Sequence, residues 1–242
     1  MNKVLLLIVL LFVQQGWATD VKPLTDWQVY QLKGQVKKMT VVQTSENGNI
    51  NREEIEFDKQ GYKTLKKVFR NNIGIDSVSA EMKFLNKERY MPYNNNKRWI
   101  VMGVEEDVEE DVEEGLTNIN KTNEYWFSDG QHVIINMGPT HEVSVKEIYS
   151  NEEKLLSQET NISIKWDDSE YNSISKHLFT YDKEGELIRT DIKISVDEVE
   201  TESYQIFVVQ KRDKQGNIIL RTVENYMEES SYKESFSYEY YN

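Results

Sequence analysis

Cysteine is absent from the 242 residues of the chain. The protein therefore has no disulfide bond, no thiol nucleophile, no thiolate ligand for a metal and no cysteine to which a lipid could be attached. Its stability has to come from packing alone. A chain of this length can bury a substantial core.

Histidine is scarce, with only His132, His141 and His177 in the chain. None belongs to the His-Glu-x-x-His pattern of zinc proteases, and no Gly-x-Ser-x-Gly elbow, phosphate-binding glycine loop or dinucleotide fingerprint is present. Carboxylate pairs such as Asp167-Asp168 are too frequent in so acidic a chain to indicate a glycosidase, although catalytic carboxylates can lie far apart in sequence. We therefore predict no catalytic residue, metal site or cofactor site, and no concave pocket around the histidines.

Positive charge is in deficit, with 29 Lys and Arg against 42 Asp and Glu. An acidic surface repels phosphate backbones and anionic lipids, so we expect no nucleic-acid partner. The same charge favours solubility.

Long apolar runs are also missing, apart from residues 4–13, which follow Lys3. Small residues at Gly16 and Ala18 suit a cleavage site before Thr19, so the layout is that of a secretory signal peptide at 1–18. A membrane anchor is the alternative, but the run covers about half of the ~20 residues that a spanning helix needs. We predict cleavage, a soluble mature chain with a net charge of −14 (28 Lys and Arg against 42 Asp and Glu), and a periplasmic or secreted location.

A short pattern, aromatic-Asp-Lys-x-Gly, recurs along the chain at 57–61 and 181–185, and at 212–216 with Arg in the aromatic position. The residues on either side alternate between apolar and polar, which is typical of strands. Asp accepts hydrogen bonds from backbone amides just ahead of it, and Gly adopts the positive φ that closes a bulged hairpin. We therefore predict hairpin tips at 58–61, 182–185 and 213–216. Weaker versions occur at 44–52, 127–135 and 149–158.

The predicted fold is all-β. Alternating runs of this kind indicate roughly a dozen strands, and no strand–helix–strand alternation points to a parallel sheet. We expect an antiparallel meander of repeated β-hairpins that forms one extended or curled sheet. It would make up a single domain at 19–242 with an acidic loop insertion.

The stretch Tyr181-Asp182-x-x-Gly185-x-Leu187 resembles the core of the tyrosine-aspartate (YD, or Rhs-type) repeat. Residues 32–44 and 56–65 look like the opening of small exported bacterial proteins, mostly uncharacterised, that carry scattered copies of this repeat. The resemblance implies an antiparallel repeat sheet, sometimes linked to carbohydrate or partner binding, and no catalytic residues. Because the clear copies stand far apart, no closed shell of contiguous repeats is expected.

One segment departs from the strand pattern. Residues 104–115 repeat Val-Glu-Glu-Asp, within a loop-rich excursion at about 86–122. Like charges four residues apart oppose a helix, and the run lacks the spacing of an EF-hand. A solvated acidic loop is the favoured interpretation, and a weak Ca²⁺ site is the alternative.

Aromatic residues carry the sharpest binding hypothesis. They could form a sugar-stacking platform, but strands also use aromatic residues to pack one face of a sheet, which is the favoured interpretation. The residues concerned are Trp27, Trp99, Trp126, Trp166, Tyr171, Tyr204, Tyr226, Tyr232, Tyr238 and Tyr240. The sequence thus predicts an exported β-repeat binding or scaffold module whose partner could be a protein or a carbohydrate. A carbohydrate-active or other hydrolytic enzyme that uses carboxylates distant in sequence is the alternative.

Overall fold

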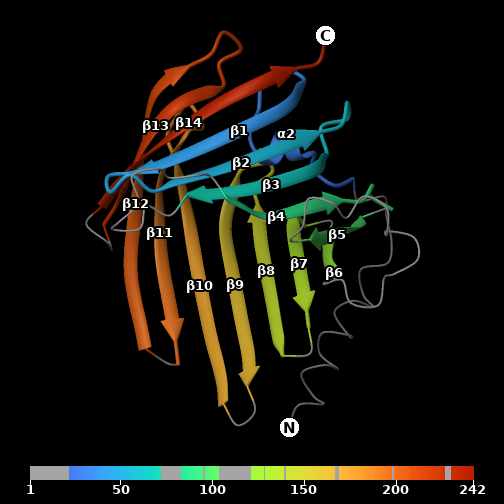
Figure 1. Cartoon of the computed structure of the whole chain (residues 1–242), viewed down its shortest axis with the longest axis vertical. Helices are drawn as coiled ribbons and strands as arrows, with labels where there is room; N and C mark the ends of the chain where they lie inside the picture. The colour runs from blue at the N-terminus through green and yellow to red at the C-terminus, as the bar shows by residue number, and fades with distance from the viewer. Residues whose placement is uncertain are drawn as a thin grey trace.

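The computed structural model describes residues 22–71, 83–94, 96–103, 121–127, 129–138, 140–166, 169–197, 199–226 and 230–242. The predicted signal peptide, the acidic run at 104–115 and the pair Asp167-Asp168 lie outside these residues. Within them, strands β1 to β14 follow one another in chain order around a closed antiparallel barrel (Figure 1). The strands are β1 (Val36–Ser45), β2 (Ile50–Phe57), β3 (Lys63–Asn71), β4 (Lys83–Tyr90), β5 (Lys97–Gly103), β6 (Lys121–Trp126), β7 (Gln131–Met137), β8 (His141–Tyr149), β9 (Leu155–Trp166), β10 (Ser169–Tyr181), β11 (Leu187–Val196), β12 (Val199–Arg212), β13 (Ile218–Asn225) and β14 (Ser230–Tyr240).

The antiparallel meander is confirmed, but the expected extended or curled sheet is wrong because the sheet closes on itself. Strand β1 pairs with β14 from Val36 opposite Tyr240 to Ser45 opposite Tyr232. Closure removes both free edges, whose unpaired amides and carbonyls would otherwise invite association with other chains. Alternation along one strand shows which residues share a face but does not show that the first and last strands meet.

The loop-rich excursion predicted at 86–122 is also partly wrong, because residues 97–103 form strand β5. This strand pairs with β4 on one side and β6 on the other. Its alternation is clear in the side chains, since Arg98 is 2% exposed and Trp99 is 49% exposed. The sequence favours a loop here because asparagines, which are typical of turns, come directly before this strand.

The predicted hairpin tips are confirmed. In the tip at 182–185, Asp182 Oδ1 accepts hydrogen bonds from the amides of Glu184 and Glu186, at 3.0 and 2.8 Å. Gly185 has a φ of +85°, a backbone conformation that glycine adopts at little cost. In the backbone of this tip, the amide of Asp182 donates to the carbonyl of Glu186 and the amide of Gly185 donates to the carbonyl of Asp182. The same pair of backbone bonds occurs in the tips at 58–61 and 213–216 and in the weaker versions at 45–48, 127–130 and 150–153.

The aromatic residue before each Asp has a structural reason. A register shift next to the turn, the mark of a β-bulge, falls at Phe57 and at Tyr181. Phe57 is 3% exposed and belongs to the main buried cluster with Val36, Met39 and Ile55. In these two copies the motif places an aromatic ring inside the barrel next to the turn, and in the third copy Arg212 takes that position at the cavity wall.

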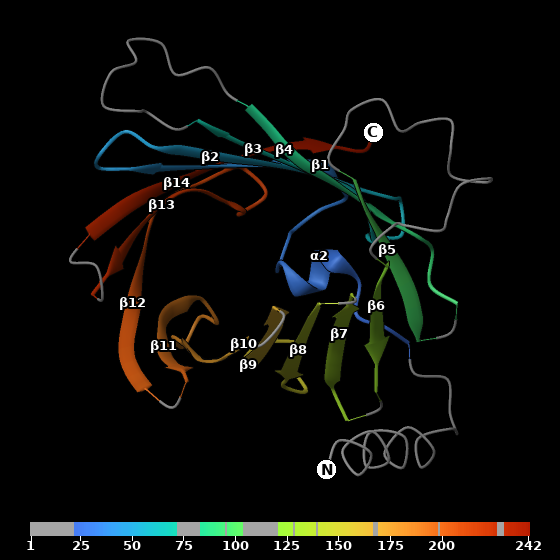
Figure 2. The ribbon, with the colours of Figure 1, turned by 60° about the horizontal axis from the view of Figure 1, so that its bottom comes forward.

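The chain before β1 lies inside one end of the barrel, next to several hairpin turns. We call residues 22–35 the plug; it contains the short helix α2 (Asp26–Val29), which begins with a capping box between Thr25 and Gln28. Figure 2 shows α2 inside the ring of strands, and Figure 1 shows the long strands β8 to β12 running away from it.

Hydrogen bonds fix the plug to three hairpin turns. The amide of Trp27 donates to the carbonyl of Gly61 at 3.1 Å. Gln28 Nε2 donates to Glu153 Oε1 at 2.7 Å. The amide of Lys33 donates to Asn217 Oδ1 at 2.7 Å, and Asn217 Nδ2 donates back to the Lys33 carbonyl. The turns of the hairpin repeat are thus the surface on which the plug is seated.

Candidate functional site

A cavity of about 430 Å³ lies inside the barrel, between the plug and the inner faces of β1, β2 and β9 to β14. Aliphatic and aromatic side chains form most of its wall. They are Val29, Tyr30, Leu32, Met39, Val41, Ile55, Leu155, Phe179, Tyr181, Leu187, Ile218, Phe236 and Tyr238. Along the strands these residues alternate with outward-facing positions, some of them polar and others, such as Leu178 and Val208, apolar and exposed.

Two arginines belong to the same wall, and each is paired within it. Arg221 on β13 binds Glu234 on β14, and Gln43 Nε2 donates to the other oxygen of that carboxylate at 2.9 Å. The Arg221 guanidinium also lies 4.9 Å from the ring centre of Phe207 and 5.4 Å from that of Phe236. The carboxylate and the rings together stabilise this partly exposed positive charge.

The second arginine, Arg212, lies where β12 ends. It forms an ion pair with Glu186 and donates to the carbonyl of Gly216 at 2.6 Å. Glu53, a further acidic residue of the wall, pairs with Lys66 at 3.1 Å. Arg221, Arg212 and Glu53 of the wall are therefore each matched by a side chain of opposite charge.

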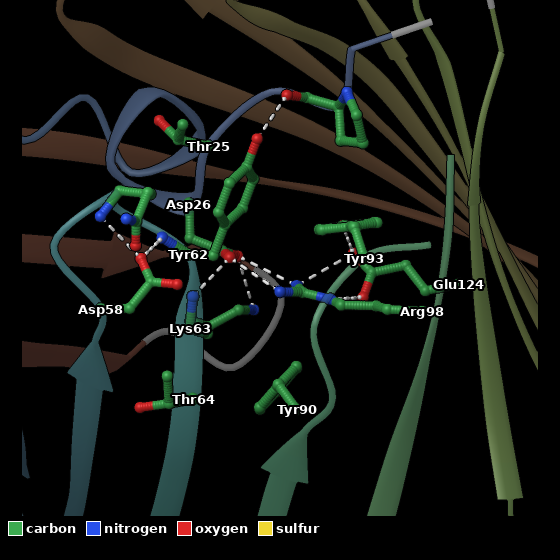
Figure 3. Close-up of polar contacts among 12 residues, drawn as sticks. Thr25, Asp26, Asp58, Tyr62, Lys63, Thr64, Tyr90, Tyr93, Arg98 and Glu124 are labelled. Atoms are coloured by element: carbon green, nitrogen blue, oxygen red, sulfur yellow. Dashed lines mark hydrogen bonds and ion pairs between the residues drawn. The ribbon is translucent and has the colours of Figure 1, made fainter. Parts of the chain in front are cut away.

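A buried polar network occupies the opposite side of the plug (Figure 3). Arg98 on β5 donates to Asp26 of α2 and to Glu124 on β6, with Nη1–Oδ2 and Nη2–Oε1 distances of 3.1 Å each. Lys63 on β3 also reaches Asp26, through its backbone amide at 2.7 Å and its ammonium at 3.3 Å. Tyr93 donates its hydroxyl to Glu124 at 2.9 Å.

The network continues to a histidine. His132 on β7 lies between two carboxylates, with Nε2 2.7 Å from Glu124 and Nδ1 2.7 Å from Glu147. Its ring stacks on Trp126, with ring centres 4.2 Å apart. Glu147 also accepts from Tyr149 and from Gln158.

The pKa values of this network follow from burial and partners. Burial alone would raise the pKa of Glu124, but hydrogen bonds from His132 and Arg98 outweigh it and hold that pKa well below its ordinary value. Burial alone would lower the pKa of His132, but hydrogen bonds to Glu124 and Glu147 outweigh it and raise that pKa. An imidazolium between two carboxylates is the result.

The structure separates the three histidines. None of them is among the residues that line the cavity. His141 lies 3.0 Å from Asn136 Oδ1, and His177 lies 2.7 Å from Ser175 Oγ, with burial lowering its pKa. Only His132 meets carboxylates, and it does so in a closed network.

The aromatic residues considered for a sugar platform do not gather on one surface. Trp126 is buried, Tyr238 and Tyr240 pack against the main core cluster, and Trp27 does the same from the plug. Tyr204 and Tyr226 stack on the outer face, with ring centres 4.2 Å apart. Trp99 is exposed on β5, and the side chain of Trp166 lies outside those described.

Neither the cavity nor the polar network is predicted by the sequence. The residues of the network come from segments far apart in the chain, from Asp26 to Glu147, so no sequence spacing links them. The one available signal was a charged residue at an inward strand position, as at Arg98 and Glu124, and reading it requires the strand boundaries first. Over the part of the chain that the structure describes, no cluster of three His, Asp or Glu side chains could hold a metal ion. No helix there is long and apolar enough to cross a membrane.

Comparisons with known proteins add little to this geometry. No family model and no curated protein matches the chain. Among solved structures, a porin-like protein from Bacteroides uniformis ATCC 8492 is similar, at 10% sequence identity and a TM-score of 0.45, over 84% of this chain and 98% of that one. A TM-score this low carries no inference about function.

Proposed function

We propose that the protein is an exported binding module that holds a small molecule inside its barrel. The cavity of about 430 Å³ is the observation that supports this proposal. Ligand pockets are commonly about 300–1,000 Å³ in volume, largely apolar, and provided with a few oriented polar groups. The wall formed by β1, β2, the plug and β9 to β14 has that composition.

Exposed ion pairs on the outer face of the barrel favour an aqueous location for the mature protein. Lys176 on β10 pairs with Glu159 on β9 at 3.1 Å, and Lys193 on β11 pairs with Glu200 on β12 at 2.8 Å. All four side chains are substantially exposed on the outward face. Charges on a lipid-facing strand surface cost about 2–4 kcal/mol near the bilayer centre. We therefore place the mature chain in the periplasm or outside the cell, with Thr19 as its first residue.

The resemblance to exported YD-repeat proteins fits this proposal. The resemblance depends on the hairpin turns that begin at Asp58, Asp182 and Asp213. The enzymatic alternative needs carboxylates that face a substrate. Glu124 and Glu147 meet at His132, but neither lines the cavity. Binding is therefore the function that the geometry favours.

A fluorescence titration tests the proposal. N-phenyl-1-naphthylamine, a neutral dye that brightens in apolar surroundings, should bind the purified mature protein at one site. Val41→Trp places an indole in the cavity, whereas Val42→Trp places the same group on the outer face of the same strand. We expect the first substitution to abolish binding and the second to leave it intact.

Two results would overturn the proposal. One is the absence of saturable dye binding to the folded wild-type protein. The other is equal binding by both tryptophan variants, which would place the dye on the outside of the barrel. Circular dichroism of each variant confirms that the barrel is folded.

A further inference from the structure

We infer that the cavity takes an uncharged, ring-containing apolar molecule and rejects carboxylates, phosphates, sulfonates and ammonium groups. This inference rests on the proposed binding function and adds the chemical class of the ligand. It follows from three features of the wall: its deeper charges form ion pairs, the hydroxyl groups of Tyr181 and Tyr238 are bonded to the barrel, and five aromatic rings face the cavity.

Paired charges are the first feature. Arg221 is held by Glu234, Arg212 by Glu186 and Glu53 by Lys66, so no ion of the deep wall is left to receive an opposite charge. Glu234 is 4% exposed, and the Arg221 guanidinium lies beside the rings of Phe207 and Phe236, so its charge already has partners within the wall. A charged ligand would lose its hydration and gain no counterion, which is a large penalty in an apolar site.

Hydrogen-bonding groups are the second feature. Tyr181 donates its hydroxyl to the carbonyl of Leu155 at 2.9 Å, and Tyr238 donates to the carbonyl of Ile218 at 2.7 Å. Both tyrosines line the cavity, yet their polar ends are bonded to the barrel wall. Gln43 is likewise occupied by Glu234. At these three residues the surface left to a ligand is mainly carbon.

Ring surface is the third feature. Five aromatic side chains reach the cavity, from the plug, β10 and β14. They are Tyr30, Phe179, Tyr181, Phe236 and Tyr238. Aromatic rings favour stacked or edge-on contacts with other rings, beyond the gain from burying apolar area. A planar or cyclic ligand uses these faces better than a flexible chain does.

The mouth of the cavity agrees with an uncharged ligand. Two exposed side chains of opposite sign line it, Lys33 from the plug and Glu184 from the turn at 182–185. A strong field of one sign would attract or repel charged molecules as they entered. With one positive and one negative group, the mouth selects neither sign.

Two dyes that differ by a single group test the inference. N-phenyl-1-naphthylamine is neutral, and 1-anilinonaphthalene-8-sulfonate is the same ring system with a sulfonate. We expect the anionic dye to bind the cavity at least about tenfold more weakly, since an uncompensated charge costs more than one decade in affinity. Binding to the cavity is defined as the part that Val41→Trp removes and Val42→Trp retains.

A change of selectivity gives an independent readout. Glu234→Gln removes the partner of Arg221 and leaves an unpaired positive charge at the wall. The ratio of anionic to neutral dye affinity should rise by about tenfold or more. Glu186→Gln, which frees Arg212 at a less buried position, provides the same test if the first variant does not fold. Glu239→Gln, on the outer face of β14, is the matched control and should leave the ratio unchanged.

The outcomes separate this inference from the proposed function. If neither dye shows cavity binding, the proposed function fails. If the anionic dye binds the cavity as tightly as the neutral dye, or if the two glutamine variants leave the ratio unchanged, the binding function stands and the inferred ligand class is wrong.

Discussion

Arg98 on β5 donates to both carboxylate oxygens of Asp26 in α2, at 3.1 and 3.3 Å. The two residues are 2% and 4% exposed. Because the same guanidinium binds Glu124 on β6, it ties the plug to the barrel wall. The plug supplies part of the cavity wall, so this contact supports the candidate binding site from the opposite side of α2.

Asp26→Asn should weaken the fold strongly. The substitution removes one of the two carboxylates that pair with Arg98 inside the barrel. Breaking a buried ion pair in this way typically lowers the free energy of unfolding by about 3–5 kcal/mol. The free energy of unfolding from urea titrations, followed by tryptophan fluorescence, measures the loss. Glu159→Gln, which breaks an exposed pair with Lys176, should change it by less than about 1 kcal/mol. Equal effects would show that the network does not hold the plug.

Gly61→Ala should cost more stability than Gly185→Ala. Both glycines have positive φ, at +90° and +85°, so each substitution carries a backbone penalty of roughly 1–2 kcal/mol. A Cβ at Gly61 would also lie 2.6 Å from the ring of Trp27 in the plug, whereas at Gly185 the nearest atoms belong to the flexible end of Lys154, at 3.1 Å. Thermal unfolding of the two variants compares them, and a larger loss for Gly185→Ala would contradict the seating of the plug on the turn at 58–61.

Stability should decline on the alkaline side of neutrality. The raised pKa of His132 means that its contribution is fully present below the unfolded value of about 6.5 and is lost as the pH rises through the folded value. The decline is about 1.4 kcal/mol per pH unit within that window. Glu147 and Glu124 have lowered pKa values, so their contribution is lost only as the pH falls below their ordinary range.

Two histidine variants isolate this effect. Urea titrations at pH 6 and pH 9 should show the decline in the wild-type protein and its loss in His132→Gln. The pKa of His177 is lowered by burial, which gives the opposite sign, so His177→Gln should retain the decline. A wild-type protein that is equally stable at both pH values would rule out the imidazolium between Glu124 and Glu147.

The hairpin turns could be predicted from the sequence because their chemistry is local. Asp182 and Gly185 lie within four residues of each other, and their roles depend only on the backbone between them. Closure of the barrel could not be predicted in this way. It joins Val36 to Tyr240, and the apolar alternation in both strands is the same in an open sheet.

The cavity and the network were missed for a related reason. The plug helix α2 spans only Asp26–Val29, too short to produce a periodic apolar pattern. Arg98 follows an asparagine-rich stretch that indicated a loop, and its burial depends on partners from α2 and β6. Such contacts depend on the tertiary structure, and only the closed barrel brings them together.

The most direct test of the binding account is to locate a bound ring inside the barrel. Crystals of the mature protein soaked in iodobenzene, a neutral ring with a strong anomalous scatterer, would give the position of the iodine without reference to fluorescence. The account predicts an iodine peak between the plug and β1, in contact with Val41, Phe179 and Phe236. Iodine found only on the outer face, near the exposed side chains of Leu178 and Val208, would contradict it.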